Sequence, residues 1–162
     1  MEGDHLLDTQ ELEGLYPKAA FLDSREVVLF GEKGFVLYQA DSKKIETQEN
    51  FESEINSVFC TNQKLGFIFK NEDDNGKYRM EIYNKAGKKS STYYFDLDYS
   101  GMTADDDEVI LYNDEEMLIY QMGGRVRFRG TFNTAVDRRS CVWEDGLYWL
   151  IDDQSLREIR IR

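Results

Sequence analysis

Acidic side chains are the residues of this sequence that are numerous enough, and close enough together, to do chemistry. Asp105, Asp106, Asp107 and Glu108 are consecutive, and clustered carboxylate oxygens are the ligands that hard divalent cations take. Successive residues of an extended chain point in alternating directions, however, so four consecutive acids rarely converge on one ion. We therefore favour a solvated turn over a cation site for this run.

A second acidic stretch, Asn71–Gly76, is a weaker match to a calcium loop. The EF-hand pattern needs Asp at its first position and Glu at its twelfth, where this chain has Asn71 and Ile82. The runs on both sides are strand-like, and the Asn75-Gly76 pair is a strong hairpin-turn signal. This stretch is also predicted to be a turn.

Other catalytic chemistry lacks its usual residues. The single histidine, His5, lies near the start of the chain, so a Ser-His-Asp triad or a His-ligated zinc site cannot be assembled. Cys60 and Cys141 have no metal-ligand spacing and each sits in an apolar run. We interpret them as buried free thiols, with a disulfide as the alternative. We predict no catalytic residue, no metal ligand and no cofactor, hence a protein that is not an enzyme.

Two groups of residues are candidates for binding a partner. Arg125, Arg127 and Arg129 alternate with apolar residues, so a strand would place the three guanidinium groups on one face. With Arg138 and Arg139 they could recognise a carboxylate-rich partner; the alternative is an outward strand face that balances the protein's own acids. The aromatic residues of the second group are Trp143, Tyr148 and Trp149. They could stack on a peptide or a sugar, or fill a packed interior.

The charge of the chain limits its partners. The net charge is −12. Residues 91–124 hold nine acids and no base, whereas residues 125–162 hold eight arginines and six acids. A chain this acidic repels phosphate, so nucleic acid and anionic membranes are not expected partners. No apolar run approaches the roughly 18–20 residues that span a bilayer, and no signal peptide opens the sequence. The chain is expected to be soluble as given.

The elements that must position these residues are short strands, and they repeat. Val109–Tyr112 and Met117–Tyr120 are two apolar runs around a polar turn, which is the pattern of a buried hairpin. Similar hairpins occupy residues 26–38, 65–83 and 147–159. The first three hairpins close on Tyr38, Tyr83 and Tyr120, and a second turn and a further strand then lead to Phe51, Phe95 and Phe132.

This rhythm predicts an all-β, propeller-like fold. Four short strands in about 40 residues is the size of a propeller blade, and a sandwich or barrel is the alternative. We expect four repeats of four antiparallel strands at about 18–53, 54–97, 98–134 and 135–162, after an N-terminal segment 1–17. The fourth repeat lacks its outermost strand, and residues of about 5–13 are predicted to supply it and close the ring.

These repeats resemble the WD40-like and quinoprotein-like β-propeller class, without its Gly-His or Trp-Asp signature. The resemblance rests on two pairs of segments, Val109–Tyr120 with Gly124–Phe132, and Tyr148–Asp153 with Glu158–Ile161. They are most similar to an uncharacterised bacterial propeller family of unknown function. That resemblance implies a membrane anchor and more blades outside the cytoplasm, and it supplies no catalytic residue.

The function predicted from these observations is a non-catalytic protein-interaction or scaffolding module. Its partner is expected to be a protein or peptide, with a basic one suggested by the acidic balance of the chain. Two alternatives stay open at this point. One is an enzyme or a ligand- or cation-binding propeller with carboxylates in its channel. The other is an incomplete ring that assembles with a second copy of itself.

Overall fold

The structure, a computed structural model, describes residues 9–131, 140–144, 147–151 and 155–161, and this part of the chain contains strands and turns but no helix. The strands are β1 (Lys18–Phe21), β2 (Glu26–Phe30), β3 (Gly34–Gln39), β4 (Lys44–Asn50), β5 (Ile55–Cys60), β6 (Lys64–Lys70), β7 (Tyr78–Asn84), β8 (Lys89–Phe95), β9 (Gly101–Ala104), β10 (Glu108–Tyr112), β11 (Glu116–Gln121), β12 (Arg125–Thr131), β13 (Ser140–Glu144), β14 (Leu147–Ile151) and β15 (Leu156–Arg160). Among the described residues no helix is long and apolar enough to cross a membrane.

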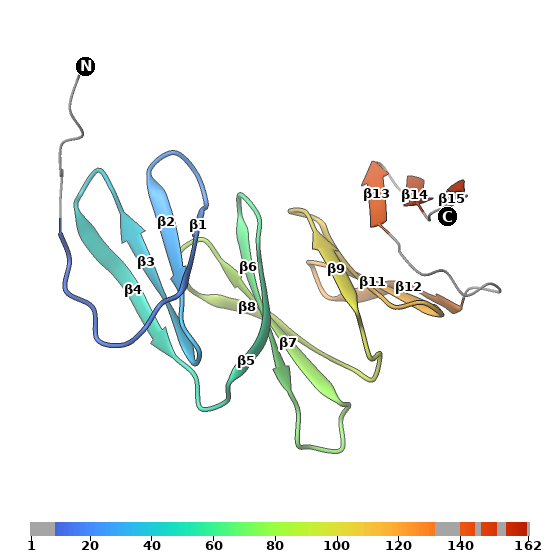
Figure 1. The fold of residues 1–162 in the computed structure, drawn as a ribbon, viewed down its shortest axis with the longest axis horizontal. Helices are drawn as coiled ribbons and strands as arrows, with labels where there is room; N and C mark the ends of the chain where they lie inside the picture. The colour runs from blue at the N-terminus through green and yellow to red at the C-terminus, as the bar shows by residue number, and fades with distance from the viewer. Residues whose placement is uncertain (1–8, 132–139, 145–146, 152–154, 162) are drawn as a thin grey trace.

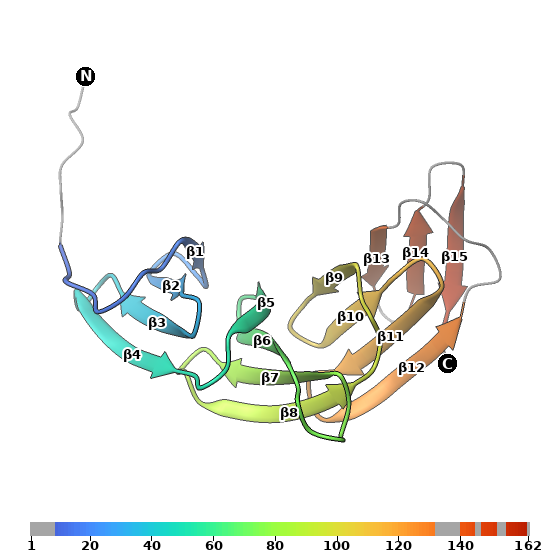
Figure 2. The same ribbon diagram turned by 60° about the horizontal axis from the view of Figure 1, so that its bottom comes forward.

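Each predicted repeat is a separate antiparallel sheet. The first sheet is β1-β2-β3-β4, the second β5-β6-β7-β8, the third β9-β10-β11-β12 and the fourth β13-β14-β15. The sheets stand side by side in chain order (Figure 1). They form an open arc whose inner side carries β1, β5, β9 and β13 and whose outer side carries β4, β8 and β12 (Figure 2). The prediction of an all-β, propeller-like fold is confirmed.

A hydrophobic cluster fills each junction between neighbouring sheets. At the first junction Leu22, Val28, Phe30, Phe35 and Leu37 pack against Leu65, Phe67, Phe69 and Tyr83. At the second, Phe59, Ile68, Met80, Ile82, Tyr93, Phe95 and Leu97 pack against Val109, Leu111, Leu118, Tyr120 and Met122. At the third, Ile110, Met117 and Ile119 pack against Tyr148. The central strands of the second and third sheets are therefore apolar on both faces, because each of these two sheets has a neighbour on either side.

Four of the repeated aromatic residues, Tyr83, Tyr120, Phe51 and Phe95, lie in these junctions. Tyr83 of the second sheet packs edge-on against Phe35 of the first, with ring centroids 5.5 Å apart. Phe51, which follows the first sheet, lies 5.1 Å from Phe67 of the second. Phe95 takes the corresponding place 6.3 Å from Tyr120 of the third sheet. Such pairs add about 0.5–1.5 kcal/mol beyond the area they bury, which explains in physical terms why Tyr and Phe recur at matched offsets.

An irregularity of register accompanies the repeated tyrosine in each four-stranded sheet. The pairing with the outer strand shifts between Leu37 and Tyr38, between Ile82 and Tyr83, and between Ile119 and Tyr120. Each shift is a β-bulge, in which the outer strand carries one extra residue opposite its partner. The extra residue of β12 is Arg127, because Phe128 pairs with Ile119 and Val126 pairs with Tyr120.

The N-terminal segment differs from its prediction. Of the expected closing strand over residues of about 5–13, residues 5–8 lie outside the described part of the chain, and residues 9–13 form no strand. Gln10 instead donates to the carbonyl of Lys43 at 3.2 Å, and Gln48 donates to the hydroxyl of Tyr16 at 3.2 Å. Residues 9–17 thus lie against the first sheet, at the opposite end of the arc from the fourth (Figure 2).

The physical reason is the composition of this segment. Residues 9–13 read Thr-Gln-Glu-Leu-Glu and contain a single apolar residue, Leu12, so a strand there would bury little surface. Gly14 then adopts a φ of +115°, a left-handed conformation outside the strand region.

Candidate functional site

The loops of the arc emerge on two opposite faces, and the charge on the two faces differs sharply. We call one the acidic face, and it consists of loops 31–33, 51–54, 71–77, 96–100 and 113–115. It carries ten acids and two lysines. The acids are Glu32, Glu52, Glu54, Glu72, Asp73, Asp74, Asp96, Asp98, Asp114 and Glu115, and all ten are exposed. The opposite face, loops 22–25, 40–43, 61–63, 85–88, 105–107 and 122–124, carries five acids and four bases.

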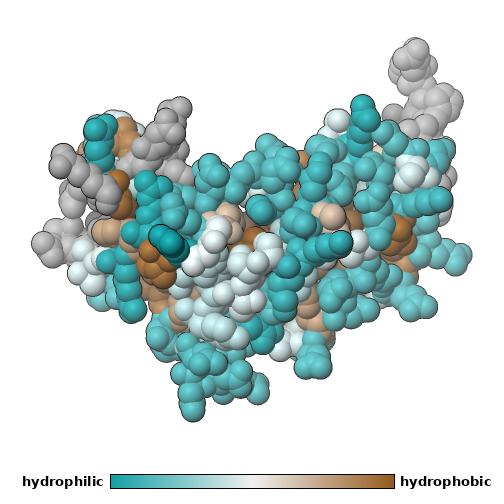
Figure 3. Space-filling view, turned by 180° about the vertical axis from the view of Figure 1, so that it is seen from behind, coloured by the Kyte–Doolittle hydropathy of each residue, from teal (hydrophilic) through white to brown (hydrophobic). Residues whose placement is uncertain are grey.

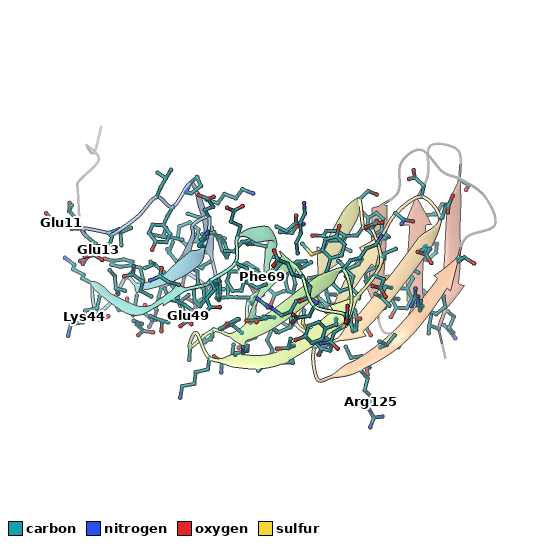
Figure 4. The ribbon with its side chains drawn as sticks, turned by 90° about the horizontal axis from the view of Figure 1, so that it is seen from below. Glu11, Glu13, Lys44, Glu49, Phe69 and Arg125 are labelled. Atoms are coloured by element: carbon teal, nitrogen blue, oxygen red, sulfur yellow. The ribbon has the colours of Figure 1, made fainter. Side chains whose placement is uncertain are left out.

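The direction of the chain reverses at each turn, and this explains why the charges are segregated. Consecutive antiparallel strands end on opposite faces, so the loops of one face recur at every second turn of the sequence. Loops β2–β3, β4–β5 and β6–β7 lie along the lower edge of the molecule (Figure 1), and hydrophilic side chains cover that edge (Figure 3). Figure 4 looks onto the acidic face from below. Its one ion pair between described residues joins Lys77 and Asp98, so nine of the ten carboxylates have no cationic partner among the described residues.

Two cavities open on the acidic face where the first and second sheets meet. The larger, of about 640 Å³, is lined by carboxylates of Glu52, Glu54, Glu72 and Asp73 together with Lys33, Lys70 and Arg79. The smaller, of about 550 Å³, is more apolar and is bounded by Tyr16, Phe30, Ile55 and Val58. The face therefore combines an excess of negative charge with hollows that have both polar and apolar walls.

Arg79 lines the larger cavity, and Glu81 and Phe69 contact its guanidinium group. Its Nε lies 3.1 Å from the buried carboxylate of Glu81, and its charge lies over the ring of Phe69 at 4.8 Å. Glu81 also accepts a hydrogen bond of 2.9 Å from the hydroxyl of Tyr83. Burial and this hydrogen bond raise the pKa of Tyr83 well above its usual value, so the tyrosine is neutral and acts as a donor.

The acidic run 105–108 is a turn whose carboxylates point to different partners. Asp105 Oδ1 accepts the backbone N–H groups of Asp107 at 2.8 Å and Glu108 at 2.7 Å. Asp106 accepts the hydroxyl of Thr61 and, at 3.0 Å, the N–H of Gln63 on the preceding sheet. Divergent carboxylates of this kind do not form a cation site. Within the described part of the chain no group of three or more His, Cys, Asp or Glu side chains could hold a metal ion.

The stretch Asn71–Gly76 is the β6–β7 hairpin loop. The side-chain amide of Asn71 donates to the carbonyl of Asp73 at 3.1 Å and to that of Gly76 at 2.9 Å. Gly76 has a φ of +146°, which favours glycine. The loop is closed by backbone and amide contacts, which leaves its acidic side chains exposed to solvent.

The three arginines of β12 do not share one face, so that part of the prediction is wrong. The bulge inserts Arg127 next to Phe128 and breaks the strict alternation. Arg127 pairs with the buried Glu108, and its charge lies 5.9 Å from the centre of the Tyr148 ring at the junction with the fourth sheet. Arg129 pairs in register with Leu118, which faces the second sheet. Arg125 is exposed and points away from the body (Figure 4).

The remaining predicted site residues are distributed as follows. Arg138 and Arg139 lie outside the described residues, and so do the side chains of Trp143 and Cys141. Trp149 is half-buried on β14. Cys60 is a free, half-buried thiol whose pKa is raised by burial and, to a smaller extent, by Asp106. Low acidity of this kind leaves the thiol protonated and unreactive at neutral pH.

Sequence reasoning missed the buried carboxylate of Glu108. Its side chain is 4% exposed, and it binds both Arg127 and the hydroxyl of Tyr148, the latter at 2.6 Å. The signal was present: Asp-x-x-Glu opens the hairpins at both Asp23–Glu26 and Asp105–Glu108. In each pair the Asp caps the turn, and the Glu begins the strand and is buried.

Comparison with known proteins places the chain in a family. Residues 2–161 match the family of unknown function DUF5711. The chain belongs to that family. No curated protein matches it. The predicted resemblance to an uncharacterised propeller family is confirmed at this level.

Solved structures share the fold at low sequence identity. The computationally designed Ika4 protein aligns with a TM-score of 0.61 and 10% identity, over 99% of both chains. BBS1N, crystallised in complex with ARL6DN, aligns with a TM-score of 0.60 and 12% identity, over 93% of this chain and 53% of that chain. Hsv2p of Kluyveromyces lactis aligns with a TM-score of 0.55 and 12% identity, over 90% of this chain and 46% of that chain. BBS1N and Hsv2p are β-propellers, and this member of DUF5711 spans about half of their length.

Proposed function

We propose that this chain is a non-catalytic protein-interaction module whose acidic face binds a basic segment of a protein or peptide. The observation that carries the proposal is the segregation of charge between the two loop faces. The described loops of the acidic face have a net charge of −8, and the described loops of the opposite face have a net charge of −1. Patches of one sign attract partners of the other sign and speed their encounter.

The shape of the acidic face supports the same function. Four of its carboxylates line the cavity of about 640 Å³, and Glu32 lies at the cavity of about 550 Å³. Both cavities are large enough to accept side chains of a bound segment. Loops held on a rigid scaffold commonly carry binding residues, and here the sheets fix the loops. BBS1N, which shares the fold, was crystallised with a protein partner, ARL6DN. Phosphate groups of nucleic acid or of anionic lipid would be repelled by this face.

The arginines and tryptophans proposed from the sequence form a separate hypothesis. Arg125 and Arg129 are exposed on the outer strand β12, where they would suit an acidic partner. Arg127 is already engaged by Glu108, and we no longer assign it to a partner. A bacterial source and a membrane anchor stay predictions from the resemblance.

A binding experiment with charge variants tests the proposal. We would measure fluorescence anisotropy of a labelled lysine- and arginine-rich peptide against the whole chain. Glu72→Gln, Asp73→Asn and Asp74→Asn together remove three charges from the acidic face. At about 0.5 kcal/mol for each exposed charge pair, affinity should fall about tenfold. A second triple variant, Glu11→Gln, Glu46→Gln and Asp107→Asn, removes three exposed charges elsewhere and should leave the affinity near that of the parent chain.

Two results would overturn this function. Equal losses in both triple variants would mean that only net charge matters and that no face is used. A rise in melting temperature on adding calcium, without any peptide binding, would favour the cation-binding alternative, because a ligand that binds only the folded state stabilises it. If the acidic face binds the peptide, the affinity should fall strongly as the salt concentration is raised, because salt screens the charges.

A further inference from the structure

The larger cavity of the acidic face is richer in positive charge than the loops that surround it. Lys33, Lys70 and Arg79 line it together with four carboxylates, whereas the described loops of the whole acidic face carry two lysines and ten acids. Lys70 ends β6 and Arg79 is the second residue of β7, so these two cations come from the sheet and not from the loops. The cavity is therefore a spot of mixed charge on a surface that is otherwise negative.

Arg79 is the least exposed charge in this cavity. The four carboxylates and the two lysines that line it are exposed, but the side chain of Arg79 is 27% exposed and its Nε is buried. Water and salt screen a charge less when that charge is partly buried. A group that enters the cavity would therefore interact more strongly with Arg79 than with the carboxylates around it.

The contacts of Arg79 fix its guanidinium group and leave donors unused. Nε lies 3.1 Å from Glu81, and the centre of the Phe69 ring lies 4.8 Å from Cζ. The two Nη groups, which carry four N–H donors, have no hydrogen bond or ion pair within the described part of the chain. Glu81 does not neutralise Arg79 fully, because the same carboxylate also lies 3.5 Å from Lys89. One buried carboxylate thus faces two cations.

We propose that this cavity binds a carboxylate group of the basic segment, with Arg79 as the residue that holds it. The inference rests on the proposed function and adds an anionic group to what the acidic face recognises. A guanidinium group donates two parallel hydrogen bonds to a carboxylate, and Lys33 and Lys70 supply further donors at the same cavity. The carboxylate belongs either to the C-terminus of the partner or to one of its Asp or Glu side chains.

The carboxylates of the cavity suit the rest of such a segment. Glu72 and Asp73 lie at the same cavity as Arg79 and are exposed, so they would face lysine or arginine side chains next to the bound carboxylate. They also select against a phosphate group. Phosphate carries a charge of about −1.5 to −2 at neutral pH, so these acids would repel it more strongly than a carboxylate with a single charge.

A pair of probe peptides gives opposite results for a carboxylate site and for simple attraction between charges. Both are labelled peptides of alternating glycine and lysine, one with a free C-terminal carboxylate and one with a C-terminal amide. Fluorescence anisotropy measures their binding to the whole chain. The amide peptide is more positive by one charge, so attraction to the acidic face alone would make it bind more tightly. We expect the free acid to bind about tenfold more tightly instead, because a charge-assisted hydrogen bond forms only with the acid.

Substitutions at Arg79 test whether that preference comes from the proposed residue. Arg79→Lys keeps the charge but loses the planar pair of donors, and Arg79→Gln loses both, so each should abolish the preference for the free acid. Lys70→Gln changes an exposed residue of the cavity and should weaken the preference about twofold, with unchanged circular dichroism. Arg25→Gln is the matched control. Arg25 also pairs with a carboxylate, that of Asp41 at 3.1 Å, but on the opposite face, and its loss should leave the preference unchanged.

A third peptide, amidated and with glutamate in place of one internal glycine, identifies the source of the carboxylate. A preference for this peptide that is lost in Arg79→Lys would assign the site to a side chain, whereas a preference for the free acid would assign it to a chain end. An amide peptide that binds at least as tightly as both carboxylate peptides, or a preference that survives both substitutions of Arg79, would overturn the inference. Affinity that still falls in the triple variant of the acidic face would then leave the proposed function standing, whereas no binding of any peptide would overturn both.

Discussion

Replacing Arg127 should expose how the third and fourth sheets are joined. Arg127→Met removes the cation that faces Glu108, whose side chain is only 4% exposed, and leaves the hydroxyl of Tyr148 as its described partner. Breaking a fully buried ion pair costs about 3–5 kcal/mol. Because the side chain of Arg127 is 29% exposed, water screens part of the interaction, and we expect a loss of about 2 kcal/mol of unfolding free energy. For a chain of this size that corresponds to roughly 4–8 °C in melting temperature.

A double-mutant cycle identifies the source of the loss. Glu108→Gln keeps an acceptor for Tyr148 but removes the charge that Arg127 neutralises. If the loss in Arg127→Met comes from an uncompensated buried carboxylate, the double variant should be more stable than the sum of the two single losses predicts, by about 1–2 kcal/mol. Urea denaturation of the four proteins measures this coupling.

The control and the refuting result are both simple. Arg129→Met changes a neighbouring arginine that is exposed, and it should alter stability by no more than about 0.5 kcal/mol. Equal losses for Arg127→Met and Arg129→Met, or strictly additive losses in the cycle, would show that the pair at the third junction contributes nothing specific.

Two further substitutions test the packing and the burial of charge. A Cβ at Gly66 would lie 2.0 Å from the ring of Phe59, so Gly66→Ala should lower the free energy of unfolding by about 2 kcal/mol through overpacking. A Cβ at Gly123 would meet nothing within 4 Å, so Gly123→Ala should leave stability unchanged. Denaturant midpoints of the two variants measure the difference. Burial raises the pKa of Glu26, so its charged form destabilises the fold above that pKa, and the destabilisation disappears as pH falls below the unfolded value. Glu26→Gln should therefore be more stable than the parent at neutral pH and lose this advantage in acid, and melting curves across that pH range would contradict the reasoning if the difference were constant.

The repeat was predictable from sequence because its aromatic residues serve packing. Tyr83, Tyr120, Phe51 and Phe95 recur at matched offsets since each fills the same place between two sheets. The fold could be read from this pattern. The orientation of Arg127 could not, because a bulge adds one residue to β12, and strict alternation assumes that no residue is added.

The acidic face could not be predicted from the sequence alone. Charge counted along the chain mixes loops of both faces, since the strands carry the chain from one face to the other at each turn. The run 105–107, which together with Glu108 makes four consecutive acids in the sequence, lies on the nearly neutral face. Only the topology shows that loops 71–77, 96–100 and 113–115 accumulate their acids on one surface.

The bulges of the outer strands have a consequence for solubility. The outer strands β4, β8 and β12 each leave one edge of backbone N–H and C=O groups without a neighbouring strand in their sheet, and flat open edges are templates for fibril growth. In every four-stranded sheet the added residue falls on this outermost strand, next to the repeated tyrosine. A bulge bends and twists the strand that carries it, so no outer edge offers a continuous flat ladder to another molecule. The arc can thereby keep three open edges at its rim and still resist stacking into amyloid.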